Sequence, residues 1–359
     1  MTAHPRSVIA LAVVAAALTI SDVSAAVTDR TEEIANYNGA DRQAVLEEGA
    51  RKEGRFTVYT VGGESKPIFE RFGQKYPFVR LELYQAHNVE ITRRVIEEQK
   101  MGRFLADAIE LNDGALGLIR DAGALQSYYT PEMPNFLPDA VEPGKHWIST
   151  YESYKGLGYN TKLTKPEEAP MEPDDLLDPK WKGKMTLAAP SMQTWVGGLI
   201  ASKGEDFIRK LGSQNLIVYN MGARALANLV VSGEVQMSPV MFNSHMHVSA
   251  SKGAPVAWRA IGAVYATVNG AAIAKHAPNP HASMLLVDFL LSKESQTMRI
   301  NMGYASGRSD LDSPDKPKQV LYPSRLPDLD QQYEKWNRLG TQVFGKGKDH
   351  PSVKASGGE

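Results

Sequence analysis

Residues 156–191 read GLGYNTKLTKPEEAPMEPDDLLDPKWKGKMTLAAPS and are the stretch that decides the fold. The pattern predicts a strand at 156–160, a proline-bounded excursion, a one-turn helix, a solvated basic segment at 180–184, and a second strand that stops at Pro190. We expect a helix to begin just past this second strand. The stretch therefore predicts a strand-to-helix unit with a long surface insertion.

Length and composition indicate a folded chain with two lobes. The chain has 359 residues, and single hydrophobic cores stop growing at roughly 250 to 300 residues. Hydrophobic residues make up 42% and charged residues 23%, with a formal net charge of -1. A chain with this charge balance has no overall positive electrostatic potential that would attract nucleic acid, so no nucleic-acid partner is expected. The absence of cysteine excludes disulfides, thiolate metal sites and a cysteine-linked lipid anchor.

The first 25 residues have the pattern of a cleavable signal peptide. Arg6 precedes an apolar run at 8–20, and the small residues at 23–25 form a cleavage site before Ala26. The alternative is a retained membrane anchor, but a bilayer span needs about 20 apolar residues. We therefore expect a protein exported to the periplasm.

Strands and helices alternate in the first half of the chain. Strands are predicted at 55–60, 79–83 and 107–111, each followed by a helix. Alternation of this kind predicts a parallel sheet covered on both faces. Ligands bind at the strand ends of such sheets, because amide groups at helix N-termini point there.

The second half repeats this alternation and then returns to the first lobe. We expect lobe one to comprise residues 26–150 and 264–345, lobe two residues 151–263, and a disordered tail at 346–359. Two crossings near residues 150 and 264 would join the lobes. The predicted fold class is a two-lobed α/β protein with parallel-rich sheets.

Two passages resemble one family closely. They are DLLDPKWKGK at 175–184 and KHAPNP at 275–280, the latter followed by FLLSKE at 289–294. This wording is similar to that of the periplasmic solute-binding proteins of iron(III)-transport ABC importers. The resemblance implies the two-lobed type II fold, hinge closure on a solute, an inner-membrane ABC permease as partner, and no enzymatic activity. A monomer without a cofactor is expected.

The resemblance also implies which positions would hold iron if the protein bound it directly. Family members that bind ferric ion directly use a histidine after the first strand, an acidic residue after the third, and a tyrosine pair in the second lobe. These positions correspond here to Gly63, to Asn112 with Asp113 beside it, and to Asn243 and Ser244. Phenolate and carboxylate oxygens suit a hard cation, and all four positions lack them. We therefore expect no metal site of the usual kind.

Neutral hydrogen-bond donors remain at the predicted junctions, and they favour a polar organic solute or an oxyanion. Arg93, Arg94 and Arg224 are interpreted either as bidentate anion ligands or as solvated helix faces. Aromatic residues at 59, 195 and 265 are interpreted either as stacking surfaces or as packing. His245 and His247 are two residues apart, which at a helix start does not suit one metal ion. His245 remains a candidate donor to an oxyanion.

The predicted function is capture of a small polar or anionic organic solute of phosphorylated, phosphonate or carboxylate type. The alternatives are a ferric-ion carrier with an unusual ligand shell and, from other classes, an exported enzyme or a sensor subunit. Catalytic motifs such as G-x-S-x-G, H-E-x-x-H and the P-loop are absent. The predicted ligand-binding residues are Tyr59, Gly62, Gly63, Asn88, Asn112, Ser191, Gln193, Thr194, Trp195, Arg224, Asn243, Ser244, His245 and Tyr265.

Overall fold

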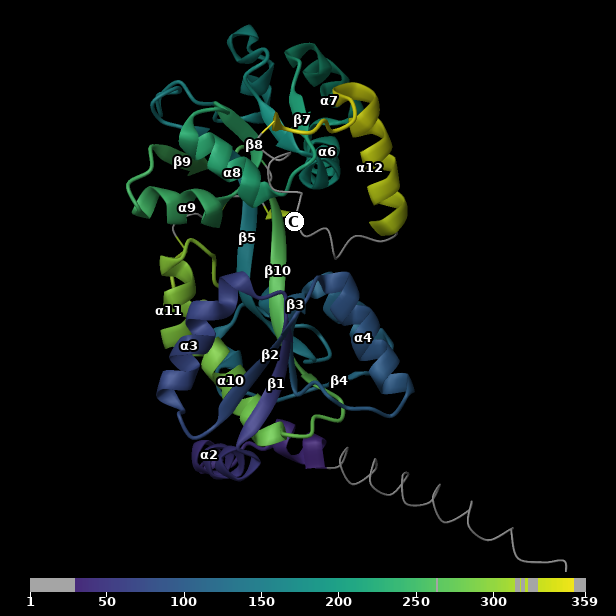
Figure 1. Cartoon of the computed structure of the whole chain (residues 1–359), viewed down its shortest axis with the longest axis vertical. Coiled ribbons are helices and arrows are strands. Elements are labelled where there is room, and N and C mark those ends of the chain that lie inside the picture. The colour runs from purple at the N-terminus through teal and green to yellow at the C-terminus, as the bar shows by residue number, and fades with distance from the viewer. Residues whose placement is uncertain (1–29, 263, 314–316, 318–319, 322–328, 352–359) are drawn as a thin grey trace, which may run out of the picture. The chain divides into compact units, whose positions relative to one another are not determined.

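The structure is a computed structural model that describes residues 30–262, 264–313, 317, 320–321 and 329–351. The predicted signal peptide at 1–25 and residues 352–359 of the predicted tail lie outside these residues. The chain forms two compact units (Figure 1). Unit 1 contains the described residues up to 150, together with 269–295 and 308–310, and unit 2 contains the rest.

Unit 1 is built on a mixed sheet in which three neighbouring strands are parallel. Strand β1 (Arg55–Thr60) lies between β2 (Arg80–Gln85) and β3 (Ala108–Asn112), parallel to both. The other edge of β3 pairs antiparallel with β10 (Val264–Ala274), which also pairs with β4 (Leu125–Gln126). The carboxyl ends of β1, β2 and β3 therefore lie at one edge of the sheet.

Helices follow each of these three strands, as the alternation predicts. They are α3 (Lys66–Lys75), α4 (Asn88–Lys100) and α5 (Asp113–Asp121). A second helical pair is formed by α2 (Arg42–Glu53) and α10 (Pro280–Leu291), where Gly49 allows the ring of His281 to lie against the α2 backbone. Apolar residues of the strands and of α4 and α5 form one buried cluster that includes Ile91, Ile109 and Leu116. Burial of this shared core is the main stabilising contribution.

A buried carboxylate joins three segments of unit 1. Asp107 is 1% exposed and accepts hydrogen bonds from the backbone N–H of Thr57 at 2.7 Å and of Asn279 at 2.6 Å. Burial raises the pKa of Asp107 from 3.8 to about 6, although these hydrogen bonds oppose the shift. The Asp107 carboxylate therefore has hydrogen-bond donors in place, but its ionisation costs free energy because the group is buried.

This raised pKa predicts a pH-dependent stability. In the folded state Asp107 keeps its proton up to about pH 6, whereas in the unfolded chain it releases this proton near pH 3.8. The contribution of Asp107 to the free energy of unfolding is therefore largest below pH 3.8 and falls as the pH rises to about 6. Asp107→Asn is expected to flatten this slope in urea unfolding series between pH 4 and 7. Asp312→Asn, which changes an exposed aspartate, is the control. If Asp107→Asn leaves the pH slope of the unfolding free energy unchanged, as the control is expected to do, the slope does not arise from Asp107.

Unit 2 contains a second parallel arrangement. Strands β6 (Thr186–Ala188) and β7 (Ile217–Tyr219) are parallel, and Met185 forms a parallel bridge with Met237 at the start of β8 (Met237–Phe242). Strand β5 (Trp147–Asn160) runs antiparallel to β8 and to β9 (Val256–Arg259). The helices after β6, β7 and β8 are α6 (Ala189–Lys203), α8 (Ala223–Ser232) and α9 (Asn243–Ser251), and α7 (Glu205–Leu211) follows α6.

Three local predictions in the opening stretch are corrected. The predicted strand at 156–160 is the last part of a longer continuous strand, β5, which begins at Trp147. Pro190 does not stop a strand but lies in the first turn of α6, where a proline costs no backbone hydrogen bond. The segment at 180–184 is solvated only at its lysines, because Trp181 is 3% exposed and belongs to the core of unit 2.

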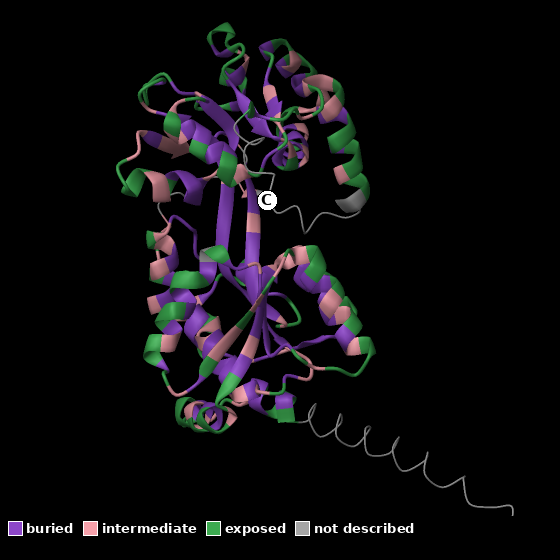
Figure 2. Cartoon of the chain, viewed as in Figure 1, coloured by how far each residue is buried: buried purple, intermediate pink, exposed green. Residues whose placement is uncertain are grey.

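The C-terminal region belongs to unit 2, which corrects the predicted extent of lobe one. Helix α12 (Leu329–Phe344) packs against α6 (Figure 1). Gly197 of α6 leaves room for the ring of Trp336, and Gly340 of α12 leaves room for Met192. Figure 2 shows the outer face of α12 as exposed, whereas Trp336 and Leu339 are buried.

Residues 346–351 of the predicted tail have defined positions. Lys348 forms a parallel bridge with Tyr219, so this segment lengthens the edge of the β6–β7 sheet. His350 is buried against Tyr219 and lies 3.0 Å from Glu234. In the described part of the chain, no helix is long and apolar enough to cross a bilayer.

Candidate functional site

The strand-end edge of unit 1 contains four of the predicted ligand residues. Gly62 has a φ of 96°, and a side chain there would collide with Gln85. Gly63 is exposed and opens the short helix that leads into α3. Asn88 begins α4, and Asn112 caps α5 by accepting a hydrogen bond from Ala115 at 2.8 Å. The structure thus brings these predicted residues to one edge, where helix N-termini supply amide donors.

A carboxylate beneath this edge was not predicted. Glu110 is buried on β3, and its two oxygens contact the hydroxyls of Ser65 and Thr150, the latter at 3.0 Å. Ser65 immediately precedes α3, so the carboxylate holds the start of that helix. The available signal was a charged residue inside an otherwise apolar strand, AIELN at 108–112.

Tyr59 and the α4 arginines make contacts within unit 1. Tyr59 is 1% exposed, and its hydroxyl lies 2.8 Å from Glu98 and 3.0 Å from Nε of Arg94. Burial raises the pKa of Tyr59 well above its ordinary value. Arg94 also pairs with Glu98, whereas Arg93 lies on the exposed face of α4. These contacts correspond to the packing interpretation of Tyr59 and to the solvated-face interpretation of Arg93.

Strand ends and helix starts also meet in unit 2. At the start of α6, Ser191 is buried and its backbone carbonyl accepts a hydrogen bond from the hydroxyl of Thr194 at 3.0 Å, while Gln193 is half-buried. At the start of α8, Arg224 is exposed. Asn243 begins α9, where its amide accepts from the N–H of Tyr154 at 3.0 Å and donates to the carbonyl of Gly303 at 2.8 Å.

The side chains of α9 that were predicted to face solute are buried within unit 2. Ser244 is 2% exposed and His245 is 7% exposed. Burial, and secondarily the charge of Arg224, lowers the pKa of His245 to about 4. His245 is therefore neutral at pH 7, and His247 lies exposed further along the helix. Among the described residues, no group of three or more histidine, aspartate or glutamate side chains is placed to hold a metal ion.

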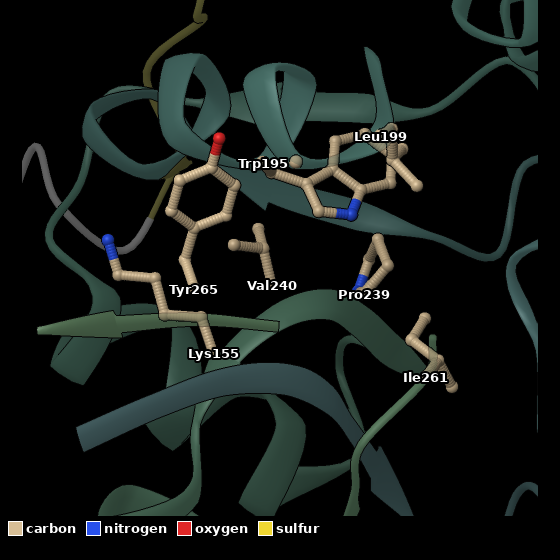
Figure 3. Close-up of a pocket in the computed structure, with 8 residues that line it drawn as sticks. Lys155, Trp195, Leu199, Pro239, Val240, Ile261 and Tyr265 are labelled. Atoms are coloured by element: carbon tan, nitrogen blue, oxygen red, sulfur yellow. The ribbon is translucent and has the colours of Figure 1, made fainter. Parts of the chain in front are cut away.

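A cavity in unit 2 combines predicted residues with an unpredicted lysine (Figure 3). Its lining residues are Lys155, Trp195, Gly198, Leu199, Pro239, Val240, Ile261 and Tyr265. Trp195 and Tyr265 were predicted as ligand-binding residues, and Thr194 accepts a hydrogen bond from Lys155 at 3.2 Å. Burial lowers the pKa of Lys155 to about 8. The signal that identifies Lys155 is a lone cation in the middle of a strand that is otherwise buried.

The architecture of both units is that of a type II periplasmic binding protein. Among solved structures it resembles iron-bound HitA from Pseudomonas aeruginosa, with 21% identity, a TM-score of 0.62, and coverage of 80% of this chain and 99% of that chain. It also resembles Trichodesmium FutA in complex with iron and citrate, with 17% identity, a TM-score of 0.62, and coverage of 82% and 100%. A substrate-binding protein of an ABC transporter from Agrobacterium tumefaciens has 15% identity, a TM-score of 0.67, and coverage of 79% and 94%.

The chain belongs to the bacterial extracellular solute-binding protein family, whose model matches residues 107–337. The predicted family and fold class are thereby confirmed. Proteins of this family and fold bind solutes for ABC transporters and are not enzymes, which agrees with the lack of catalytic motifs. Their extracellular character places the chain outside the cytoplasmic membrane.

Proposed function

We propose that this protein captures a small polar or anionic organic solute in the periplasm and delivers it to an inner-membrane ABC permease. The observation that carries the proposal is Lys155, a half-buried cation whose hydrogen-bond partner is the neutral Thr194. Burial alone accounts for its lowered pKa, with no contribution from a neighbouring carboxylate. An incompletely neutralised cation of this kind favours an anionic ligand.

The strand-end edges support the same class of solute. Neutral donors are placed at the helix starts of unit 1, at Gly63, Asn88 and Asn112. Amides at helix N-termini stabilise oxyanions without requiring a charged side chain. The residues at the positions that would hold ferric ion in the iron-transport family are glycine, asparagine and serine. No contact among the described residues favours a ferric site over an organic anion.

The proposal is tested by thermal-shift screening of the purified protein, followed by calorimetry. The panel contains phosphorylated, phosphonate and carboxylate compounds, and ferric ion with and without citrate. We expect at least one organic anion to raise the melting temperature, because a ligand that binds only the folded state stabilises it by mass action. Mass spectrometry of any co-purified solute is expected to show the compound chemically unchanged. Stabilisation by ferric ion alone would overturn the proposal.

A further inference from the structure

The amino ends of the strands in unit 1 form a face opposite the edge that carries its candidate ligand residues. Strand β1 begins at Arg55 and β2 begins at Arg80, and these two residues are register partners on neighbouring parallel strands. The backbone N–H of Arg80 also donates to the carbonyl of Gly54 at 2.9 Å. Figure 1 shows these strand ends beside α2. The two exposed arginines are therefore presented together at one end of the sheet.

The pairing of Arg55 with Arg80 is unfavourable in the protein alone. Like charges directly opposite each other on neighbouring strands repel. Among the described residues, the ion pairs of these two arginines are limited to one between Arg80 and Glu82, at 3.5 Å, whose side chains are 80% and 37% exposed. Exposed ion pairs contribute little. An anion outside this face would relieve the repulsion.

Two more arginines extend the positive charge. Arg51, in the last turn of α2, is exposed, and its Cζ lies 3.6 Å from the centre of the Phe78 ring. Arg103 is exposed in the loop between α4 and β3. This loop approaches β1 on the side away from β2, because the N–H of Asp107 donates to the carbonyl of Thr57 at 2.9 Å. The four arginines therefore follow the amino ends of three adjacent strands.

Two apolar side chains extend into solvent from the same loop. Met101 is 59% exposed and Leu105 is 51% exposed. Between them, the ring of Phe104 lies 4.2 Å from the ring of His276, so the loop is anchored to the rest of unit 1 while its two apolar side chains stay in solvent. Exposed apolar groups beside basic residues are typical of surfaces that lie on anionic lipid.

We propose that this face of unit 1 docks on the surface of an anionic phospholipid bilayer. The arginines pair with lipid phosphates, and the two apolar side chains enter the boundary between headgroups and acyl chains. Because the charges are spread over three strands, they fit an extended surface better than a single soluble phosphate. The inference goes beyond solute capture, since the candidate ligand residues of unit 1 lie at the opposite end of the sheet. The amino-end face is defined by Arg51, Arg55, Arg80, Met101, Arg103 and Leu105.

Vesicle co-sedimentation tests the lipid requirement. The exported protein is mixed with vesicles of phosphatidylcholine alone or with about 30% phosphatidylglycerol, which supplies the negative surface potential. Mass spectrometry verifies that all preparations share one N-terminus. We expect partitioning to be at least about tenfold stronger with the anionic vesicles and to weaken about tenfold at high salt, because salt screens exposed charges. Equal partitioning into both kinds of vesicle, or no salt dependence, would overturn the inference.

The charged part of the face is tested by the double variant Arg55→Gln/Arg80→Gln. Partitioning is expected to fall about 25-fold, since each basic residue near an anionic surface contributes about fivefold. Arg93→Gln/Arg209→Gln is the matched control, because it removes the same net charge from side chains that are 73% and 51% exposed outside the face. Its expected effect is less than about twofold. Equal effects of the two double variants would contradict a localised docking surface.

The apolar part of the face is tested independently by Met101→Ser/Leu105→Ser. This variant is expected to partition about tenfold more weakly while keeping the salt dependence, because insertion removes both apolar side chains from water. Leu163→Ser/Met171→Ser is the control in unit 2, where these side chains are 49% and 62% exposed. The control is expected to stay within about twofold of the parent protein. A similar loss in both variants would place the contact elsewhere.

Other occupants of the face are separated by soluble anions. Inorganic phosphate, glycerol phosphate and polyglutamate are each titrated into the parent protein and into Arg55→Gln/Arg80→Gln by calorimetry. We expect the two proteins to give the same result. Binding of a phosphate compound or of polyglutamate that the variant loses, without binding of anionic vesicles, would assign the face to a soluble anion or an acidic protein and overturn the inference. Solute affinity is expected to be equal in both proteins, so failure of docking leaves the proposed function intact.

Discussion

Lys155→Met is expected to weaken solute binding by about 30-fold or more while stabilising the solute-free protein by about 1 kcal/mol. The two effects have opposite signs because the ammonium is costly when no anion is present and favourable when one is bound. Loss of one partner of a buried charge pair typically costs about 2 to 5 kcal/mol in binding, and about 1.4 kcal/mol corresponds to a tenfold change in affinity. Replacement of a buried charge by a packed apolar side chain is often stabilising.

Calorimetry and urea unfolding test this prediction together. Lys155→Arg retains the charge and is expected to bind more strongly than Lys155→Met. Lys182→Met is the matched control, since Lys182 is exposed in the same unit, and it is expected to change neither quantity by more than about 0.5 kcal/mol. A Lys155→Met variant that is both less stable and unimpaired in binding would remove Lys155 from the site.

The lowered pKa of Lys155 predicts a pH dependence of the same site. The folded pKa is about 8, against an ordinary value of 10.5. Anion affinity is therefore expected to fall as the pH rises through 8, because the amine loses its charge. The stability of the solute-free protein is expected to rise between pH 8 and 10.5, where the unfolded chain binds the proton and the folded chain does not. Lys155→Met is expected to lose both trends.

Arg42→Met is expected to destabilise unit 1 by about 3 to 5 kcal/mol. The Arg42 and Asp288 side chains are 7% and 11% exposed, and Nε lies 3.0 Å from Oδ2. Arg42 also donates to the carbonyl oxygens of Tyr37 and Tyr129, the latter at 3.1 Å. Removal of the guanidinium leaves a buried carboxylate without its counter-charge, and this penalty exceeds the net contribution of the intact pair.

The pH dependence of this variant distinguishes lost charge pairing from lost packing. Burial raises the pKa of Asp288 even though Arg42 opposes the shift. In Arg42→Met the carboxyl is expected to stay protonated to a higher pH, so the destabilisation relative to the parent protein should be smaller at pH 5 than at pH 8. Urea unfolding of Arg42→Met, Asp288→Asn and the double variant forms a double-mutant cycle, which gives the interaction energy between the two side chains.

The double variant is expected to be more stable than Arg42→Met alone, because it removes the unpaired charge. Lys52→Met is the control on the same helix. Lys52 pairs with Glu48, and these side chains are 74% and 71% exposed, so the expected change is within about 0.5 kcal/mol. A destabilisation by Arg42→Met no larger than that of the control would contradict the prediction.

Much of unit 1 follows from local sequence. Strand β1 occupies residues 55–60 as predicted, and α3 begins after it, because β-branched and aromatic residues between glycines specify a strand and Pro67 suits a first helical turn. The three strand ends of unit 1 and their helix starts likewise follow from periodicity. This is how Gly62, Gly63, Asn88 and Asn112 are assigned to one edge from sequence.

Residues that depend on distant contacts are not recoverable in this way. The sequence pattern places helix α12 in lobe one, and Trp336 fits α6 only because Gly197 leaves space for it. The lysines beside Trp181 predict a solvated segment, yet the Trp181 ring lies in the core of unit 2. Periodicity reports which residues share a face, but it does not report which element covers that face.

The stretch at 156–191 shows the same difference between what local sequence determines and what distant contacts determine. Local sequence by itself determined the family-like passage at 175–184, the strand that ends at Asn160, and a helix start near Ser191, because turn, strand and capping signals act over a few residues. Tertiary structure alone decided that Lys155, one residue before that stretch, lies beside Thr194 and a cavity formed by β5, β8, β10 and α6. The physical reason is that the burial and charge environment of a side chain are set by residues far away in the chain.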